Sequence, residues 1–132
     1  MDYKVLDLKV FGDERGSLIS LEEGRNLPFA IKRVYYIYDT KPGVERGKHA
    51  HKNLQQLIVC LHGSCSFVLD DGAARREVLL NCPDKALYIG NNIWREMKDF
   101  SYGAVLMVLA SQTYDDKEYI RDYNEFLREI QK

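Results

Sequence analysis

Residues 43–63 read GVERGKHAHKNLQQLIVCLHG, with glycine at both ends and two histidines, His49 and His51, near the middle. Successive side chains of a β-strand point to opposite faces of the sheet, so residues two apart share one face. If this segment is a strand, both imidazoles enter the same cavity while the small Ala50 points away. Taken alone, such a pair could equally be structural or lie on the surface.

Short apolar and β-branched runs alternate with turn signals over most of the chain. Expected strands cover residues 5–10, 18–21, 31–38, 54–61, 64–69, 77–80, 86–89 and 105–110. Asp70-Asp71-Gly72 is a strong hairpin signal between two of them. Several short strands joined by short loops predict an all-β sandwich or barrel.

The C-terminal segment has a different period. Tyr119, Tyr123, Leu127 and Ile130 recur at helical spacing, and Asp115 with Glu118 matches a capping box in which Asp replaces Ser or Thr. The pattern predicts one helix over residues 116–131, packed on the outside of the barrel.

Length, charge and cysteine content limit the class of protein. The 132 residues fit one domain over residues 1–132. Nineteen basic and twenty acidic side chains give a formal charge of −1, which argues against broad nucleic-acid or membrane binding. No apolar run approaches the ~20 residues of a membrane helix, and the first residues lack the build of a signal peptide. Cys60, Cys65 and Cys82 have no ligand-like spacing, which predicts reduced thiols in a cytoplasmic protein.

The spacing of Gly43, His49, His51, Gln56 and Gly63 resembles the first signature of the cupin superfamily, in which two histidines and a glutamate bind a metal inside a small β-barrel. The resemblance implies a cupin or jelly-roll β-barrel and favours the cavity position for the histidine pair. Gln56 stands at the glutamate position, and a neutral amide is a poor substitute for a carboxylate as a metal ligand.

Cupin metal sites take a further histidine from a later strand, and the matching region here is residues 90–97. The ligand position reads Arg95, a permanent cation. His62 sits beside Gly63, where we expect a turn residue, and Trp94 is expected in the core. The sequence therefore predicts no metal and no cofactor. Proton transfer by the two imidazoles is the preferred chemistry.

Basic and phenolic side chains accompany the strands expected around the cavity. Arg33 and Arg46 are the strongest candidates to hold an anionic ligand such as a diphosphate, although any one arginine could lie on a solvated surface. By alternation, Tyr35 shares a face with Arg33. Its phenol could relay protons in the cavity, or it could be a core aromatic.

Four blocks resemble the sugar-nucleotide 3,4-ketoisomerases: RVYYI at 33–37, RGKHAHK at 46–52, LDDG at 69–72 and WREM at 94–97. The resemblance extends over about residues 4–125. It implies a metal-free isomerase that moves the keto group of dTDP-4-dehydro-6-deoxy-D-glucose from C4 to C3, for the synthesis of 3-amino-3,6-dideoxyhexoses of bacterial surface glycans. It also implies a homodimer that exchanges N-terminal strands.

The same resemblance suggests roles for individual residues. His49 and His51 would be the acid–base pair, and Tyr35 would relay an oxygen-bound proton. The expected substrate-binding residues are Arg15, Arg33, Arg46, Gln56 and Arg95. Arg15 and Arg95 would bear on whether the product has the galacto or the gluco configuration at C4. Two other functions stay open: a metal-dependent cupin enzyme, and a non-catalytic sugar-nucleotide binding module that would not need both histidines.

Overall fold

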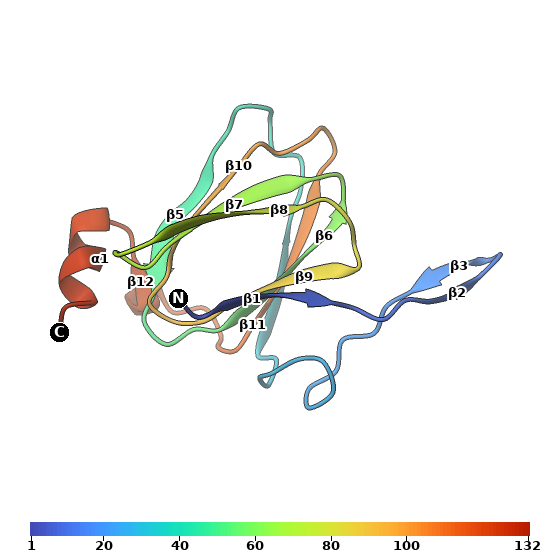
Figure 1. The fold of residues 1–132 in the computed structure, drawn as a ribbon, viewed down its shortest axis with the longest axis horizontal. Coiled ribbons are helices and arrows are strands. Elements are labelled where there is room, and N and C mark those ends of the chain that lie inside the picture. Colours follow the sequence, from blue (N-terminus) through green and yellow to red (C-terminus); the bar gives the residue numbers. More distant parts are fainter.

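The computed structural model describes residues 1–132 and is built almost entirely from short β-strands (Figure 1). The strands are β1 (Tyr3–Asp7), β2 (Phe11–Asp13), β3 (Gly16–Leu18), β4 (Arg33–Ile37), β5 (Arg46–His51), β6 (Gln56–His62), β7 (Cys65–Asp70), β8 (Arg75–Leu80), β9 (Lys85–Ile89), β10 (Trp94–Lys98), β11 (Val105–Ala110) and β12 (Tyr119–Ile120). A 3₁₀ helix, η1 (Asp116–Glu118), precedes β12, and α1 (Tyr123–Glu129) follows it.

The strands form two five-stranded antiparallel sheets. The first has the order β1-β9-β6-β11-β4 and the second the order β12-β5-β10-β7-β8. Alternate residues of β6 and β7, such as Ile58, Phe67 and Leu69, join a shared cluster of buried side chains. The predicted all-β jelly-roll architecture is confirmed, and the period of two along these strands is what assigns one face of each sheet to the core.

Two smaller clusters cover the outer faces. Leu27 and Phe29, from the segment between β3 and β4, pack with Leu57 and Val59 on the outside of the first sheet. On the outside of the second sheet, Ala50, Trp94, Ile120 and Phe126 pack together beneath α1. Ala50 thus points away from the side occupied by the histidines, as alternation predicts, and Trp94 is a core residue.

The β2–β3 hairpin lies apart from both sheets and projects from the body of the molecule, at the end away from α1 (Figure 1). Its strands pair only with each other. Phe11 and Leu18 are exposed on it. A two-stranded hairpin alone is marginally stable in water, and this one contributes no residue to the three buried clusters.

The helix predicted over residues 116–131 is wrong in extent. Residues 119–120 form β12, which pairs with β5 in the register Tyr119 to His51 and Ile120 to Ala50. Helix α1 starts later, where the carboxylate of Asp122 accepts a hydrogen bond from the Glu125 backbone N–H at 3.0 Å. Asp115 caps only the short η1 helix, through Lys117 N–H. The helical spacing of apolar residues therefore runs across two elements: Tyr119 belongs to β12, and only the residues from Tyr123 onward belong to α1.

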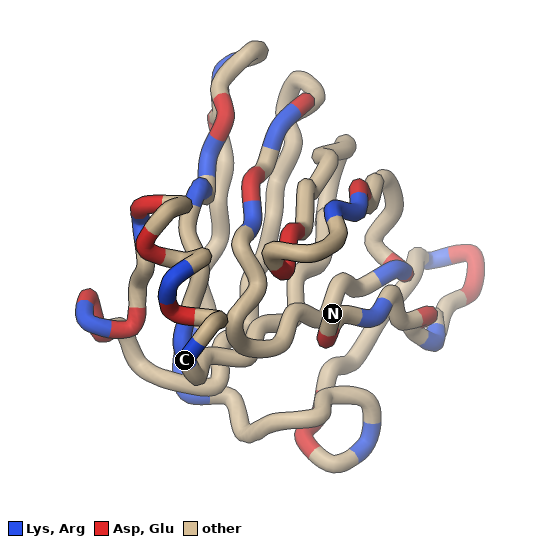
Figure 2. Tube along the Cα trace, turned by 60° about the vertical axis from the view of Figure 1, so that its left-hand side comes forward, with Lys and Arg blue, Asp and Glu red and all other residues tan.

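Charged side chains are mixed over the molecule. Figure 2 shows Lys and Arg positions interspersed with Asp and Glu positions along the strands and loops. No helix has the length and hydropathy required to cross a membrane.

Candidate active site

His49 and His51 project from β5 to the same side, with their ring centroids 4.7 Å apart and their planes at 80°. His51 is completely buried, and neither of its ring nitrogens has a hydrogen-bond partner in the protein. His49 is partly exposed and lines a cavity of about 400 Å³. One imidazole therefore meets the cavity directly and the other lies behind it.

A β-bulge next to the histidines changes which residues share their face. Opposite β10, His49 pairs with Arg95 and Gly47 with Glu96, so Lys48 is an extra residue on β5. Gly47 has a φ of 80°, and a Cβ there would lie 3.1 Å from the Arg95 carbonyl oxygen, so glycine is required. Simple alternation would put Arg46 on the face opposite His49. The bulge lets both line the cavity.

Arg95, Gln56 and Tyr35 form a hydrogen-bonded chain beneath the histidines. Arg95 Nη1 donates to Gln56 Oε1 at 2.5 Å, and Gln56 Nε2 donates to Tyr35 Oη at 3.1 Å. Arg95 Nη2 donates to the Ile93 carbonyl at 2.9 Å, while its Nε–H has no partner. The guanidinium is 2% exposed and pairs with no carboxylate. It is a buried positive charge that lacks a counterion, which is costly unless a ligand supplies the negative charge.

The cavity mouth is rich in arginine and tyrosine. Its lining comprises Arg33, Tyr35, Ile37, Arg46, Gly47, His49, Met97, Tyr114, Tyr119 and Arg121. Arg33 lies 5.1 Å from the Tyr35 ring centroid, and its buried Nε–H has no partner. The structure thus brings Arg33, Tyr35 and Arg46 together around His49.

Burial and positive charge dominate the electrostatics of the site. Burial lowers the pKa of His49 to about 4, with a further lowering from Arg95 that a hydrogen bond with the Gly47 backbone partly offsets. Burial, then Arg95, lowers the pKa of His51 to about 2. Both imidazoles are therefore neutral near pH 7 and can accept protons. Burial also raises the pKa of Tyr35, which keeps its phenol protonated.

Sequence reasoning missed the residues that the C-terminal segment adds to the cavity. Tyr119 and Arg121 line it, and Tyr114 lies beside them. Its helical spacing predicts a helix packed outside the barrel for Tyr119. Only the pairing of β12 with β5 places it opposite His51. That long-range pairing leaves no local signal in the sequence.

Two of the chain's polar candidates lie elsewhere. Arg15 is in the turn of the β2–β3 hairpin, where its guanidinium pairs with Asp13 at 2.6 Å, and it does not line this cavity. His62 is exposed at the end of β6, as expected of a turn residue. Within one chain, therefore, Arg15 does not join the other expected substrate-binding residues.

The donor groups around the histidines do not fit a tightly held divalent metal. No group of three or more His, Cys, Asp or Glu side chains is close enough together to hold one. Arg95, which pairs with His49 across β5 and β10, supplies a guanidinium that repels a cation, and its partner Gln56 supplies a neutral amide in place of a carboxylate.

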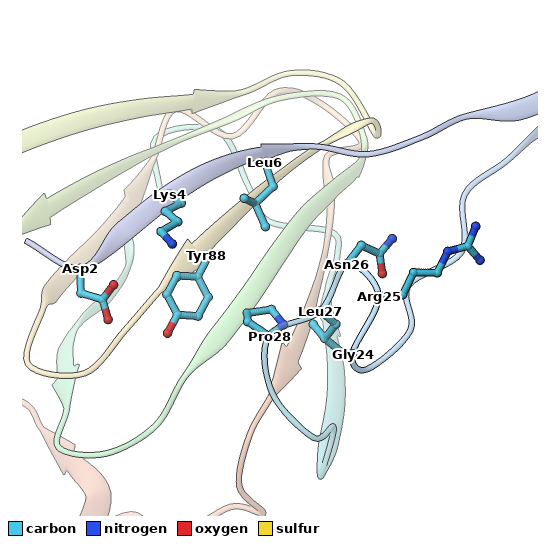
Figure 3. A pocket seen from close by; sticks show the side chains of 9 residues that line it. All are labelled: Asp2, Lys4, Leu6, Gly24, Arg25, Asn26, Leu27, Pro28 and Tyr88. Atoms are coloured by element: carbon cyan, nitrogen blue, oxygen red, sulfur yellow. The ribbon is translucent and has the colours of Figure 1, made fainter.

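A second cavity, of about 410 Å³, lies between β1, β9 and the loop at residues 24–28 (Figure 3). Lys4 and Leu6 of β1 and Tyr88 of β9 line one side of it, and Leu27 and Pro28 line the other. It contains no histidine and none of the expected site residues. The cavity beside His49 is therefore the candidate active site.

The chain is similar to known proteins over its whole length. Residues 1–131 match the family described as "FdtA: WxcM-like, C-terminal". The chain is 52% identical over 132 residues, 100% of its length and 95% of the relative's, to TDP-4-oxo-6-deoxy-alpha-D-glucose-3,4-oxoisomerase of Aneurinibacillus thermoaerophilus.

Solved structures agree with this match. A 3,4-ketoisomerase from Helicobacter canadensis superimposes with a TM-score of 0.98 at 55% identity, covering 100% of this chain and 99% of that one. A mutant of the 3,4-ketoisomerase QdtA from Thermoanaerobacterium thermosaccharolyticum, in complex with TDP-4-keto-6-deoxyglucose, gives 0.96 at 40% identity, with coverages of 98% and 94%. The chain therefore belongs to the FdtA-like family, in which these related proteins are 3,4-ketoisomerases.

Proposed function

We propose that this protein is a sugar-nucleotide 3,4-ketoisomerase, which converts dTDP-4-dehydro-6-deoxy-D-glucose into a dTDP-3-dehydro-6-deoxyhexose. One observation carries the proposal: the His49 imidazole faces a cavity, with the His51 imidazole packed directly behind it, beside a buried guanidinium that has no counterion. The relatives named above support the substrate, since one is named for it and another was solved with it.

The reaction needs proton transfers and charge stabilisation. A proton leaves C3, an enediolate forms, and a proton arrives at C4, while the hydroxyl proton moves from O3 to O4. We assign removal of the C3 proton to neutral His51 and delivery at C4 to His49, which takes up that proton from solvent through the cavity; the proton held by His51 returns to solvent before the next turnover. Tyr35 relays the oxygen-bound proton. Arg95 stabilises the enediolate, because its unpaired Nε–H and uncompensated charge lie beside the histidines.

The negative charge of the substrate changes the electrostatic environment of the histidines. Arg33, Arg46 and Arg121 line the cavity, and we assign the diphosphate to the first two. Arg33, Arg95 and Arg121 each lower the pKa of His51. An anionic substrate offsets these positive charges and so opposes the part of the pKa lowering that the arginines cause in both imidazoles. Remote nucleotide contacts then hold the sugar against the histidines.

The proposed partners follow from the same features. The donor groups disfavour the metal-dependent alternative, so we expect no metal or other cofactor. The mixed surface charge favours neither nucleic acid nor membrane as a partner. Three free cysteines, two of them buried, and a nucleotide-linked substrate suit a cytoplasmic location.

We also propose a homodimer that exchanges N-terminal strands. Strand β4 forms the edge of the first sheet and carries Arg33 and Tyr35 at the cavity, while β2–β3 is a hairpin with free edges. Exposed strand edges pair readily with another chain. Pairing of the hairpin of one copy with β4 of the second would satisfy both edges and bring Arg15 toward the partner's cavity.

Turnover tests the function directly. The wild-type protein should convert dTDP-4-dehydro-6-deoxyglucose into the 3-keto isomer, followed by NMR in deuterated solvent. His49→Asn and His51→Asn should each lose about 10²–10⁴-fold in turnover, the usual contribution of general acid–base catalysis, while still binding dTDP. His51→Asn should also abolish exchange of the C3 hydrogen with solvent.

The exposed His62 offers the matched control. His62→Asn should turn over at the wild-type rate. Near wild-type turnover in both cavity variants would make the imidazoles structural. Binding of dTDP by a wild-type protein that never isomerises the substrate would favour the binding-module alternative.

A further inference from the structure

The orientation of the His51 ring needs an explanation, because no hydrogen bond fixes it. Both ring nitrogens are buried without a protein partner. Functional histidines usually donate one ring N–H to a carboxylate or a carbonyl, which sets the tautomer and the ring plane. Here that partner is missing, so ring packing must hold the imidazole.

Tyr119 supplies this packing. Its ring centroid lies 4.5 Å from that of His51, at an interplanar angle of 67°, and 5.0 Å from that of His49, at 52°. Tilted and edge-to-face arrangements at these distances are favourable for aromatic rings. Tyr119 is thus in ring contact with both members of the pair, whereas Tyr35 contacts Gln56 and Arg33.

Tyr119 is itself held by three separate contacts. Its backbone lies in β12, opposite His51 on β5. The next residue, Ile120, is 1% exposed and packs with Ala50 and Phe126 beneath α1. The Arg121 guanidinium lies 4.5 Å from the Tyr119 ring centroid and pairs with Asp116 at 2.9 Å. A ring anchored in this way can hold its neighbours in place.

We propose that Tyr119 is a positioning residue for His49 and His51, whose ring fixes the orientation of both imidazoles and excludes water from them. The proposal deepens the isomerase function and rests on it for its catalytic consequence. The positioning itself is a property of the free protein and can be measured without substrate.

The titration of the histidines reports on this role. The charged and titratable groups that face the pair are Arg33, Tyr35, Arg46, Arg95, Tyr119 and Arg121. Burial is the largest cause of the low pKa of both imidazoles. Removal of the Tyr119 ring admits water, so the pKa of both imidazoles should rise toward the ordinary value of about 6.5.

The test compares three substitutions in the full chain. Tyr119→Leu removes the ring, and Tyr119→Phe keeps the ring without its hydroxyl. Tyr123→Leu is the control, because it loosens the same C-terminal segment through its contacts with Trp94 and Phe126 but does not touch the histidines. Imidazole titration by NMR, dTDP affinity by calorimetry, and isomerisation are measured for each.

In Tyr119→Leu, the pKa of both imidazoles should rise by at least about one unit. Turnover should fall about 10–100-fold, the scale expected of misplaced catalytic groups, with dTDP affinity changed by less than about threefold. Tyr119→Phe and Tyr123→Leu should keep the wild-type titration and turnover.

Two results would overturn the proposal. If the pKa values of both imidazoles in Tyr119→Leu equalled those of the wild type, the Tyr119 ring would not position the histidines. If Tyr119→Phe lost as much turnover as Tyr119→Leu, the hydroxyl and not the ring would carry the role. If the wild-type protein failed to isomerise the substrate, the proposed function would fall while the titration still decided the positioning role.

Discussion

Gly47 determines which side chains enter the cavity. Its positive φ allows the bulge that gives β5 one residue more than β10. Arg46 then lies on the same side as His49, three residues away, where a regular strand would separate them. The RGKHAHK block is therefore a geometric unit: the glycine and the extra Lys48 turn the arginine toward the histidines.

The buried histidines also make stability depend on pH. In the folded protein the pKa is about 4 for His49 and about 2 for His51. The unfolded chain has histidines with a pKa of about 6.5. Below about pH 6.5 the unfolded state therefore binds protons that the folded state does not, so stability is complete above this pH and falls as the pH decreases.

We expect the free energy of unfolding to decrease between about pH 6.5 and pH 4, by up to about 1.4 kcal/mol per pH unit for each imidazole. Urea unfolding at several pH values measures this slope. The double variant His49→Asn/His51→Asn should lose most of the slope over the same window. An unchanged slope in that variant would assign the pH dependence to other groups.

At the scale of elements, the sequence was most informative where the period of two is strong. Most predicted strands overlap observed ones, with ends shifted by a few residues, because alternation follows burial on one face of a sheet. The C-terminal segment was misassigned because Tyr119 and Tyr123 have a helical spacing by coincidence. The pairing of β12 with His51 and Ala50 is a tertiary interaction, and it outweighs this local preference.

The candidate site was predictable to the same extent, because local patterns do not show tertiary pairing. Strand alternation pairs His49 with His51 and Arg33 with Tyr35, and the resemblance to a family joins the two pairs at one site. Arg46 joins them through that resemblance alone, because the bulge that turns it to their side cannot be read from alternation. Tyr119 was placed in a helix. The sequence also predicts Arg15 at the site, but Arg15 lies on a hairpin that pairs with neither large sheet, a position that no local pattern encodes.

The observed helix start gives a test at this scale. Asp122 caps α1 through Glu125 N–H, so Asp122→Ala should cost about 1 kcal/mol of unfolding free energy. Asp115→Ala is the matched substitution at the start that the sequence predicted. It should cost less, because Asp115 caps only the three-residue η1 helix. Urea denaturation compares the two. If Asp115→Ala lost more unfolding free energy than Asp122→Ala, the result would support a helix that starts at residue 116, as the sequence predicts.

At the scale of the whole molecule, two features point to a second copy: the sheet edge at β4, beside the cavity, and the projecting β2–β3 hairpin (Figure 1). The other edge strands of the two large sheets are β1, β8 and β12, and of all the edge strands β4 is the one that carries both Arg33 and Tyr35 of the cavity. The proposed exchange would use the hairpin to extend the first sheet of a second copy. In that assembly each cavity combines histidines from one subunit with Arg15 from the other.

Complementation between two defective variants tests this arrangement. Arg15→Glu and His51→Asn should each be nearly inactive as homodimers. In a mixed dimer, the site that has wild-type His51 receives wild-type Arg15 from the other subunit. Random mixing on co-expression should therefore restore about a quarter of the wild-type turnover, since half of the dimers are mixed and each holds one intact site. If Arg15 served its own chain, both sites of a mixed dimer would stay defective and no activity would return. Full turnover by Arg15→Glu alone would remove Arg15 from the site altogether.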